Sequence, residues 1–559
     1  MRKLLPLLRV FCCGGLGRGF GGPPAGLTPA MGSSTKMQRR RLPSEYPTTN
    51  DGTTRPKLLV SYATNTDEAK ILDAVEDGVN VICWFAADLR VVENATTGQE
   101  NKDSETRIVE KLIEDSDSTS MRKHHHRELA EKEDTEHITK NKSNKQYSWH
   151  DIRIDFRPEV GKVAKIALEI QSKYANRHVR HLVVFGGWNA PHIVWPSTME
   201  EDLQSSLTGE DFFRAFDVWN RDIVSRGEYG WDGFDGIDWD WEGHDNRDAA
   251  TSIFSRYTLD VMGQMSVAAK KAGYIVAMAP AQSYLDPRCC CTRPGSNDLT
   301  GTGSLCDFSF SLKLPPAPVK WHPEFKHQGR NCYAYALGKY GKTVLDEHGA
   351  GGNDYAPSDE LTTSGVPPDE GHTQDRQVVV DTFDFVSLQL YETNSLALYE
   401  THNNTVDVGS YLSALASDFS RGFRIRIPSD SEEDVTTITN SMLQQEQEKQ
   451  KRGHDIISAV QQSQRGVHLE NKEQSFTSDE SWDVSIDTKT QLVWGFSFGP
   501  KSREQAFYFD HFRQIDWSEV AGAMFWEIAL DKTGFENETE RDPSKWLHMA
   551  KGLHDAMTA

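Results

Sequence analysis

Four carboxylate side chains fall within eight consecutive residues of this chain, at Asp235, Asp238, Asp240 and Glu242. The last three occupy alternate positions, so in a β-strand they point to one face, and the apolar residues between them point to the other. Like charges this close cannot all ionise freely, and perturbed carboxyls cluster where acid–base chemistry is done. The spacing therefore predicts a buried strand that carries an acid–base site.

The elements that must position these acids recur along the whole chain. Eight short apolar segments that end in polar or turn residues are predicted to be β-strands: 57–62, 79–85, 180–185, 234–242, 274–279, 383–391, 492–498 and 521–528. Helical patterns lie between several of them, at 67–77, 158–174, 211–225, 251–272, 502–513 and 543–556. Strands that alternate with helices pair in parallel, and a count of eight favours a closed (β/α)8 TIM barrel over an open sheet.

Three polar insertions interrupt this pattern, in the loops after strands two, five and six, at about 93–148, 287–380 and 420–487. Long loops without a core of their own are usually functional or disordered. We expect the first and third to be largely disordered and the Cys-rich second to be ordered over the site. An insertion that directly follows its strand lies on the C-terminal face, where barrel active sites form.

The depth of the acids in such a barrel predicts their roles. Glu242 would lie at the mouth of the C-terminal face, Asp240 about 6–7 Å deeper, and Asp238 deeper still. These groups should share protons, with a protonated Glu242 beside an ionised partner near neutral pH, as a general acid requires. Asp235 has the wrong parity for the row, so either a local bend turns it inward or it holds the chain turn.

The spacing Asp-x-x-Asp-x-Asp-x-Glu resembles the signature of glycoside hydrolase family 18, the chitinase family, and Gly236 and Trp241 match it as well. Further segments resemble family motifs in the expected order: the first strand (61–65), the third-strand Gly-Gly motif (185–188), the end of the fifth strand (278–280), the sixth-strand motif (389–392) and the last strand (523–527). The resemblance covers nearly everything from residue 57 onward except the insertions.

The resemblance implies substrate-assisted retaining hydrolysis, in which the sugar's own 2-acetamido oxygen attacks the anomeric carbon, and no metal or cofactor is needed. It gives Glu242 the role of acid and base. Asp240 would orient the acetamido N–H, and Asp238 would hold or trade a proton with Asp240. Tyr391 would donate a hydrogen bond to the acetamido carbonyl, and Trp526 would stack beneath the sugar.

Candidate substrate-binding residues are thus Trp526, Gln389, Met278, Gly187 and Asp235. Gln389 and Met278 have an ordinary core position as their alternative, and Gly187 a tight exit from its strand. The family pattern is broken at two positions. Val184 stands where a Ser is usual, which removes or replaces a support of the inner acids, and Glu392 stands where Asp or Asn is usual.

Other interpretations of these residues stay open. The acid row would also suit an ion-paired edge strand or a Mg²⁺ or Ca²⁺ site, although buried acids need compensation. The tract 124–126 is three His, which suits either a metal site or a solvated loop. Trp188, Trp195 and Trp321 would serve a glycan cleft, or be buried as large aromatics usually are.

Composition bounds the remaining possibilities. The 559 residues carry a net charge of −22, which argues against a nucleic-acid binder, and no apolar run of about 18 residues follows the N-terminus, so no membrane span is expected. The first 44 residues contain no Asp or Glu. Residues 1–55 therefore resemble a targeting segment outside the fold of residues 56–559, for secretion or the endomembrane system or, alternatively, an organelle.

The cysteines of the second insertion would suit disulfides in an oxidising compartment, with free thiols as the alternative: Cys289, Cys290, Cys291, Cys306 and Cys332. The whole pattern predicts a monomeric enzyme that hydrolyses β-1,4-linked N-acetylglucosamine polymers within the chain, most simply a chitinase acting on chitin. The alternatives are an endo-β-N-acetylglucosaminidase that cuts N-glycans and a non-catalytic chitin- or glycan-binding lectin on the same barrel.

Overall fold

The computed structural model describes part of the chain: residues 56–93, 147–197, 199, 204–244, 249–290, 305–306, 308–310, 331–346, 377–391, 395–398, 400–401, 405–427, 480–497, 507, 509–530 and 548–559. The predicted targeting segment 1–55, Trp321, Glu392, the three His at 124–126 and most of the first insertion lie outside these ranges. No helix within them is both long enough and apolar enough to cross a membrane.

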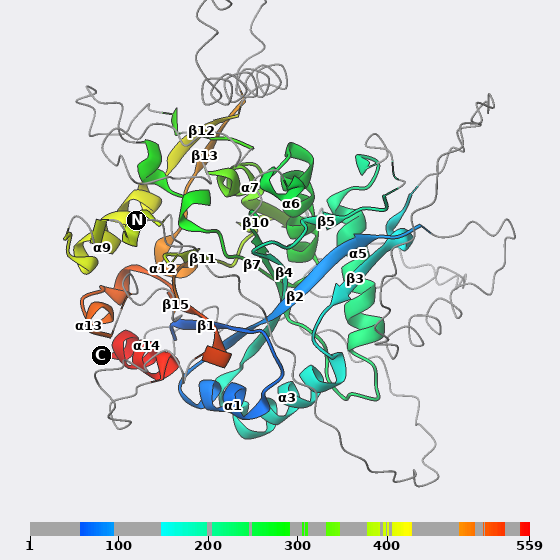
Figure 1. The fold of residues 1–559 in the computed structure, drawn as a ribbon, viewed down its shortest axis with the longest axis horizontal. Coiled ribbons are helices and arrows are strands. Elements are labelled where there is room, and N and C mark those ends of the chain that lie inside the picture. Colours follow the sequence, from blue (N-terminus) through cyan, green and yellow to red (C-terminus); the bar gives the residue numbers. More distant parts are fainter. Residues whose placement is uncertain are drawn as a thin grey trace, which may run out of the picture. The chain divides into compact units, whose positions relative to one another are not determined.

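Eight parallel strands close into a barrel (Figure 1), as the sequence predicts. They are β1 (Leu58–Ala63), β2 (Val81–Val91), β4 (Arg180–Gly187), β6 (Gly236–Trp241), β7 (Ile275–Met278), β11 (Phe385–Gln389), β14 (Leu492–Ser497) and β15 (Gly522–Trp526). Each pairs with the next in this order, and β1 pairs with both β2 and β15. The fold is a (β/α)8 TIM barrel.

Helices connect the strands, most of them where the sequence predicts them. They are α1 (Glu68–Glu76), α3 (Val160–Lys173), α5 (Gly209–Val218) with its π-helical continuation η4 (Trp219–Val224), α6 (Arg256–Lys271), α9 (Val408–Arg421) and α14 (Met549–Thr558). Side chains cap the starts of α1, α5, α6 and α9: Ser255 Oγ, for example, accepts a hydrogen bond from the backbone N–H of Thr258 at 3.1 Å. Of the predicted helix 502–513, the described part includes α13 (Phe509–Phe512).

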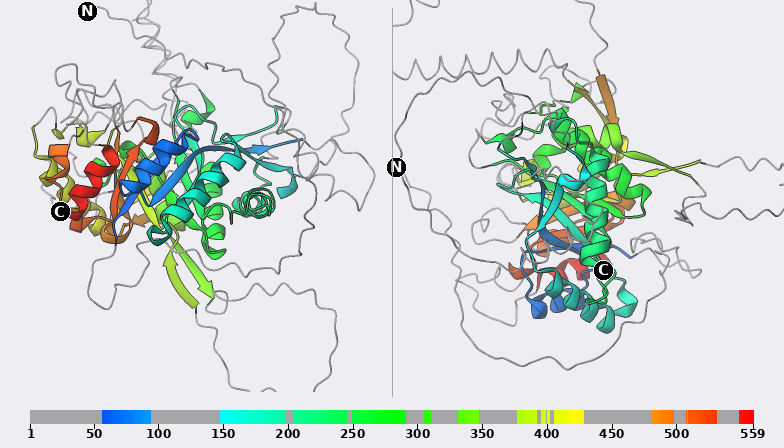
Figure 2. Two further views of the ribbon diagram at one scale, coloured as in Figure 1. Left: turned by 90° about the horizontal axis from the view of Figure 1, so that it is seen from below. Right: turned by 90° about the vertical axis from the view of Figure 1, so that its right-hand side faces the viewer.

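Helix α9 was not predicted, and neither was a second helix, which lies in the Pro-, Gly- and Cys-rich second insertion. Helix α7 (Cys332–Tyr340) packs against α6 and supplies the crossover between β7 and β11. The hairpin of β9 (Lys342–Asp346) and β10 (Gln377–Asp381) follows it and extends away from the barrel (Figure 2, left). Of the five cysteines in this insertion, only the side chain of Cys332 is described, and it is buried, so disulfide pairing stays a prediction.

The third insertion differs from the prediction in where it begins. It leaves the barrel after helix α9 and not directly after a strand, so its chain does not start on the C-terminal face. Its described ends form an antiparallel pair, β12 (Phe423–Ile427) and β13 (Glu480–Val484), to which β8 (Leu305–Cys306) of the second insertion adds a parallel strand. After the first insertion, β3 (Ile152–Phe156) returns antiparallel to the extended end of β2.

Alternation along the strands divides the core into two layers. Residues such as Val60, Leu182 and Phe385 fill the barrel interior, where they form one apolar cluster. The intervening residues, such as Val183 and Val386, pack between the strands and the surrounding helices in a second cluster. This two-layer core fixes which side chains of each strand can reach a site inside the barrel.

The start of β6 allows no side chain at position 236. A Cβ atom on Gly236 would lie 2.0 Å from the carbonyl oxygen of Ile275 on β7. We expect Gly236→Ala to lower the free energy of unfolding by about 3 kcal/mol, because backbone on both strands must move. Urea unfolding followed by tryptophan fluorescence measures this. Gly227→Ala is the matched control, since a Cβ there meets no atom within 4 Å, and an equal loss in both variants would contradict the prediction.

Candidate active site

Strand β6 holds the acid row as its spacing predicts. Asp238 and Asp240 point into the barrel and are 0% and 2% exposed, and Glu242 follows the strand end at the C-terminal mouth, half-buried. Trp239 and Trp241 lie in the layer between the strands and the helices. The indole of Trp239 donates a hydrogen bond to Ser266 Oγ on α6 at 2.8 Å. Packing on the helix side therefore fixes the direction of the acids.

The innermost acid has one strong donor. The hydroxyl of Tyr62, on β1, donates to Asp238 Oδ2 at 2.6 Å, whereas no N–H or O–H group of the described residues reaches Oδ1. Val184, at the position where the family pattern has Ser, is the register partner of Asp238. Burial raises the pKa of Asp238 to about 6, while hydrogen bonds from Tyr62 and from the thiol of Cys83 oppose this rise.

Asp240, the middle acid, accepts a hydrogen bond from a side chain on the strand two places away around the barrel. Gln389 Nε2, on β11, lies 2.7 Å from Asp240 Oδ1 and 2.7 Å from the carbonyl oxygen of Ala279. The amide thus has two acceptors, and its position is fixed by both. This contact places Gln389 beside Asp240, and its role in substrate binding stays a prediction.

Burial raises the pKa values of both Asp240 and Glu242. Burial raises the pKa of Glu242 to about 7, in the expected direction. Burial, together with the charges of Glu242 and Asp238, also raises the pKa of Asp240 well above its usual range. Each of the two carboxyls therefore ionises less readily while the other is charged, so their titrations depend on each other.

Aromatic rings line the mouth beside the acids. The Trp526 ring, at the end of β15, lies 5.2 Å from the Tyr62 ring and 4.9 Å, edge to face, from the Phe85 ring. Tyr391, just beyond β11, packs half-buried against the same interior cluster. Gly187 makes room for this group, because a Cβ on it would lie 2.2 Å from Phe85 Cζ. Gly187 thus shapes the mouth by having no side chain.

Two predicted site residues lie elsewhere. Met278 is fully buried in the outer layer between the strands and the helices, because its parity on β7 is opposite to that of the inward Ala277 and Ala279. Asp235 lies before the start of β6, at the end of the strand opposite Glu242. Its carboxylate accepts hydrogen bonds from the backbone N–H of His181 at 2.9 Å and from Arg180 at 3.3 Å. Asp235 therefore holds the chain turn and does not point into the barrel.

Sequence reasoning did not single out Tyr62, Cys83 and Phe85 as site residues. All three lie near the ends of predicted strands, and inward parity would have found Tyr62 and Cys83, which are register partners on β1 and β2. Of the additional aromatic candidates, Trp188 is 50% exposed, whereas Trp195 packs against the core. Within the described ranges, no group of three or more His, Cys, Asp or Glu side chains has the geometry of a metal site.

The raised pKa of Glu242 makes stability depend on pH. Stabilisation by the neutral carboxyl is fully present below the unfolded-state pKa, near 4, and is lost as the pH rises through about 7. Between pH 4 and pH 8 we expect Glu242→Gln to gain roughly 2 kcal/mol of unfolding free energy relative to wild type. Urea unfolding at both pH values measures this. Glu228→Gln, which alters an exposed carboxyl, should show no such gain, and a flat difference for Glu242→Gln would contradict the burial argument.

Comparisons with known proteins give similarity at the level of solved structures. No family model matches the chain, and no curated protein matches it. A GH18 chitinase from Pseudoalteromonas aurantia is similar, at 11% identity over 86% of this chain and 96% of that chain, with a TM-score of 0.33. The Group IV chitinase of Ostrinia furnacalis gives 10% identity over 90% and 100%, with a TM-score of 0.33. A glycoside hydrolase family 18 N-acetylglucosaminidase from Paenibacillus barengoltzii gives 11% over 89% and 99%, with a TM-score of 0.31. Strand pairing and the contacts above, and not these likenesses, define the barrel and its site.

Proposed function

We propose that this protein is a glycoside hydrolase that cuts β-1,4-linked N-acetylglucosamine polymers within the chain, as a chitinase does. One observation carries the proposal: the row Asp238–Asp240–Glu242 runs along the inside of the barrel, from full burial to the C-terminal opening beside Trp526. Active sites of TIM barrels form at this face. A graded row of acids with raised pKa values is suited to moving one proton toward a bound substrate.

Glu242 is the acid in this mechanism. With a pKa near 7 it carries a proton in a large fraction of molecules at neutral pH and can protonate the glycosidic oxygen. After the leaving group departs, the resulting carboxylate accepts a proton from water. The same group thus acts first as an acid and then as a base.

Asp240 and Asp238 serve the attack on the anomeric carbon, which takes place as the protonated leaving group departs. Asp240 lies behind Glu242 on the same strand and is bonded to Gln389, so it is poorly placed to attack the sugar from the opposite side. The substrate's acetamido oxygen takes that role, and Asp240 orients the acetamido N–H. To do so Asp240 must give up its proton, and Asp238 Oδ1, which no N–H or O–H group of the described residues reaches, is the acceptor available to it.

Tyr391 and Trp526 bind the sugar. Tyr391 presents a hydroxyl at the mouth and would donate a hydrogen bond to the acetamido carbonyl. Trp526, held against Tyr62 and Phe85, offers an aromatic face on which a sugar ring can stack. The acids and the tyrosine together favour an enzyme over a lectin, since a sugar-binding protein needs no proton donor with a pKa near 7.

Replacement of the acid tests the mechanism most directly. We expect Glu242→Gln to lower kcat on glycol chitin by roughly 10³-fold, because the amide cannot protonate the leaving oxygen. Reducing-end release measures turnover. Glu228→Gln should retain wild-type activity. Equal turnover by Glu242→Gln and wild type would remove Glu242 from its role, and binding without turnover by wild type would favour the lectin.

The acetamido nucleophile restricts the substrate. We expect no hydrolysis of cellulose-type glucans, because glucose carries a hydroxyl where N-acetylglucosamine carries the attacking group. A product profile on N-acetylglucosamine oligomers, set against a cellulose oligomer and a high-mannose glycopeptide, measures this. Cleavage of the glycopeptide alone would make the protein an endo-β-N-acetylglucosaminidase, whereas cleavage of the cellulose oligomer would contradict substrate assistance.

A further inference from the structure

The backbone that carries Glu242 leaves the barrel sheet, and side chains from other segments form hydrogen bonds with its carbonyl and N–H groups. The Tyr333 hydroxyl donates to the carbonyl oxygen of Trp241 at 2.9 Å. His192 Nε2 lies 3.0 Å from the carbonyl oxygen of Glu242 itself, and the backbone N–H of Gly243 donates to the Tyr284 hydroxyl at 3.0 Å. Three consecutive residues are therefore held by three side chains from three segments.

His192 serves this purpose as a neutral ring. Burial lowers its pKa to about 4, so near pH 7 it is uncharged. A carbonyl oxygen accepts only, so the ring nitrogen facing it carries the hydrogen. The ring also packs against Trp241 and Phe254, with centroids 5.3 Å and 4.5 Å away. The imidazole is thus fixed on its faces by packing and at its edge by the Glu242 carbonyl.

Tyr333 belongs to α7, the helix of the second insertion, and it is fully buried. Its ring stacks on that of Tyr284, with centroids 6.1 Å apart and an angle of 18° between the planes. Both tyrosines that bond the backbone around Glu242 therefore also support each other. The charges of Asp240 and Glu242, together with burial, raise the pKa of Tyr333 well above its usual range, so its hydroxyl stays a donor.

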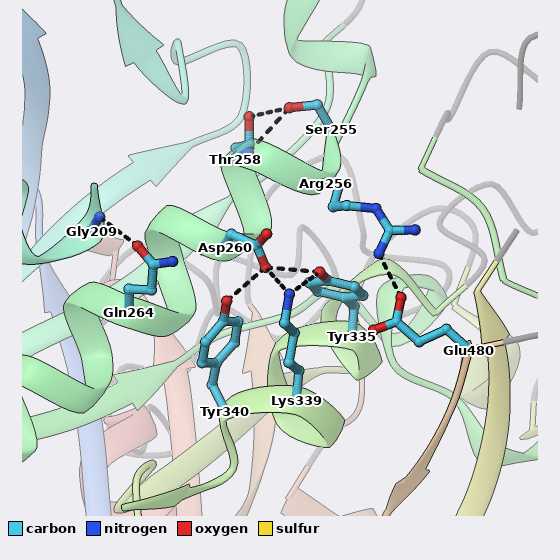
Figure 3. A network of polar contacts seen from close by, with 10 residues as sticks. All are labelled: Gly209, Ser255, Arg256, Thr258, Asp260, Gln264, Tyr335, Lys339, Tyr340 and Glu480. Carbon is cyan, nitrogen blue, oxygen red and sulfur yellow. Dashed lines mark hydrogen bonds and ion pairs between the residues drawn. The ribbon is translucent and has the colours of Figure 1, made fainter. Parts of the chain in front are cut away.

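A polar network fixes α7 against α6 (Figure 3). Asp260 Oδ1, on α6, accepts hydrogen bonds at 2.8 Å from the hydroxyls of Tyr335 and Tyr340 and from Lys339 Nζ. All three donors are on α7, so one carboxylate on α6 binds successive turns of the neighbouring helix. The helix cannot shift along α6 without breaking these contacts.

The third insertion packs on α7 as well. A Cβ on Gly338 of α7 would lie 2.6 Å from Trp482 Cβ on β13, which shows how closely the two elements approach. At the start of β13, Glu480 forms an ion pair of 2.7 Å with Arg256 at the start of α6 (Figure 3). The third insertion thus packs on α7 and forms an ion pair with α6, and α7 holds the backbone beside Glu242.

We propose that Tyr333, together with His192 and Tyr284, positions the Glu242 carboxyl at the mouth of the barrel. Helix α7 acts on the site through this contact of Tyr333. The inference rests on the proposed function. Each carbonyl or N–H that is held lies within one residue of Glu242, so loss of a contact changes where the carboxyl points. A small displacement of a proton donor lowers kcat far more than it lowers binding.

The test compares two buried tyrosines that each lose one hydroxyl. Tyr333→Phe removes the bond to the Trp241 carbonyl. Tyr274→Phe is the matched control, because its hydroxyl donates to Asp217 Oδ1 at 2.8 Å and it precedes β7, at the end of the barrel opposite the mouth. We expect Tyr333→Phe to lower kcat on N-acetylglucosamine oligomers about tenfold with KM within about twofold, and Tyr274→Phe to leave both unchanged.

Hydrogen exchange of the peptide that spans 241–243 gives a readout independent of turnover. We expect faster amide exchange there in Tyr333→Phe and not in Tyr274→Phe. An active wild type whose kcat survives Tyr333→Phe would overturn the positioning role. A wild type that cuts no N-acetylglucosamine substrate would overturn the proposed function instead. In that case unchanged exchange in Tyr333→Phe would also overturn the hold on this backbone, whereas faster exchange confined to this peptide would support it.

Discussion

Burial of three carboxyls on one strand is the constraint on which the rest of the site depends. A carboxyl inside a barrel has lost its water and must find donors or keep its proton. The donors come from other strands: Tyr62 on β1 for Asp238, and Gln389 on β11 for Asp240. Neither donor suffices for full ionisation, and the pKa values of all three acids stay raised. The proton that catalysis would use is present because solvation is incomplete.

Closure of the barrel is what makes this arrangement possible. Tyr62 and Asp238 are 176 residues apart in the sequence, and Asp240 and Gln389 are 149 apart. Only a sheet that returns to its first strand brings β1 and β11 around the same interior as β6. The outer layer contributes in turn, because Trp239 and Trp241 pack under the helices and cannot rotate inward. The direction of the acids is therefore set by what lies on the far side of the strand.

Short apolar segments in the sequence were enough to predict the eight strands, and period-two alternation was enough to predict the inward face of β6. The same rule places Met278 outside the site, because Ala277 and Ala279 are the residues of β7 that point inward. A match to a sequence motif does not by itself show which way a side chain points. Helix α7 was missed since its segment is short and lies among Pro, Gly and Cys. The raised pKa of Asp240 depends on burial in three dimensions, which spacing along a strand does not determine.

Strand β6 is anchored at both ends by groups that take no part in moving a proton. At its start, Asp235 binds the backbone N–H of His181 and the side chain of Arg180 on the neighbouring strand β4. At its end, Tyr333 binds the carbonyl of Trp241 from an inserted helix. Between these anchors, repulsion among the acids would otherwise push the strand apart. A row of like charges needs this rigidity, because a strand free to relax would separate its acids and weaken the effect of each on the pKa of the other.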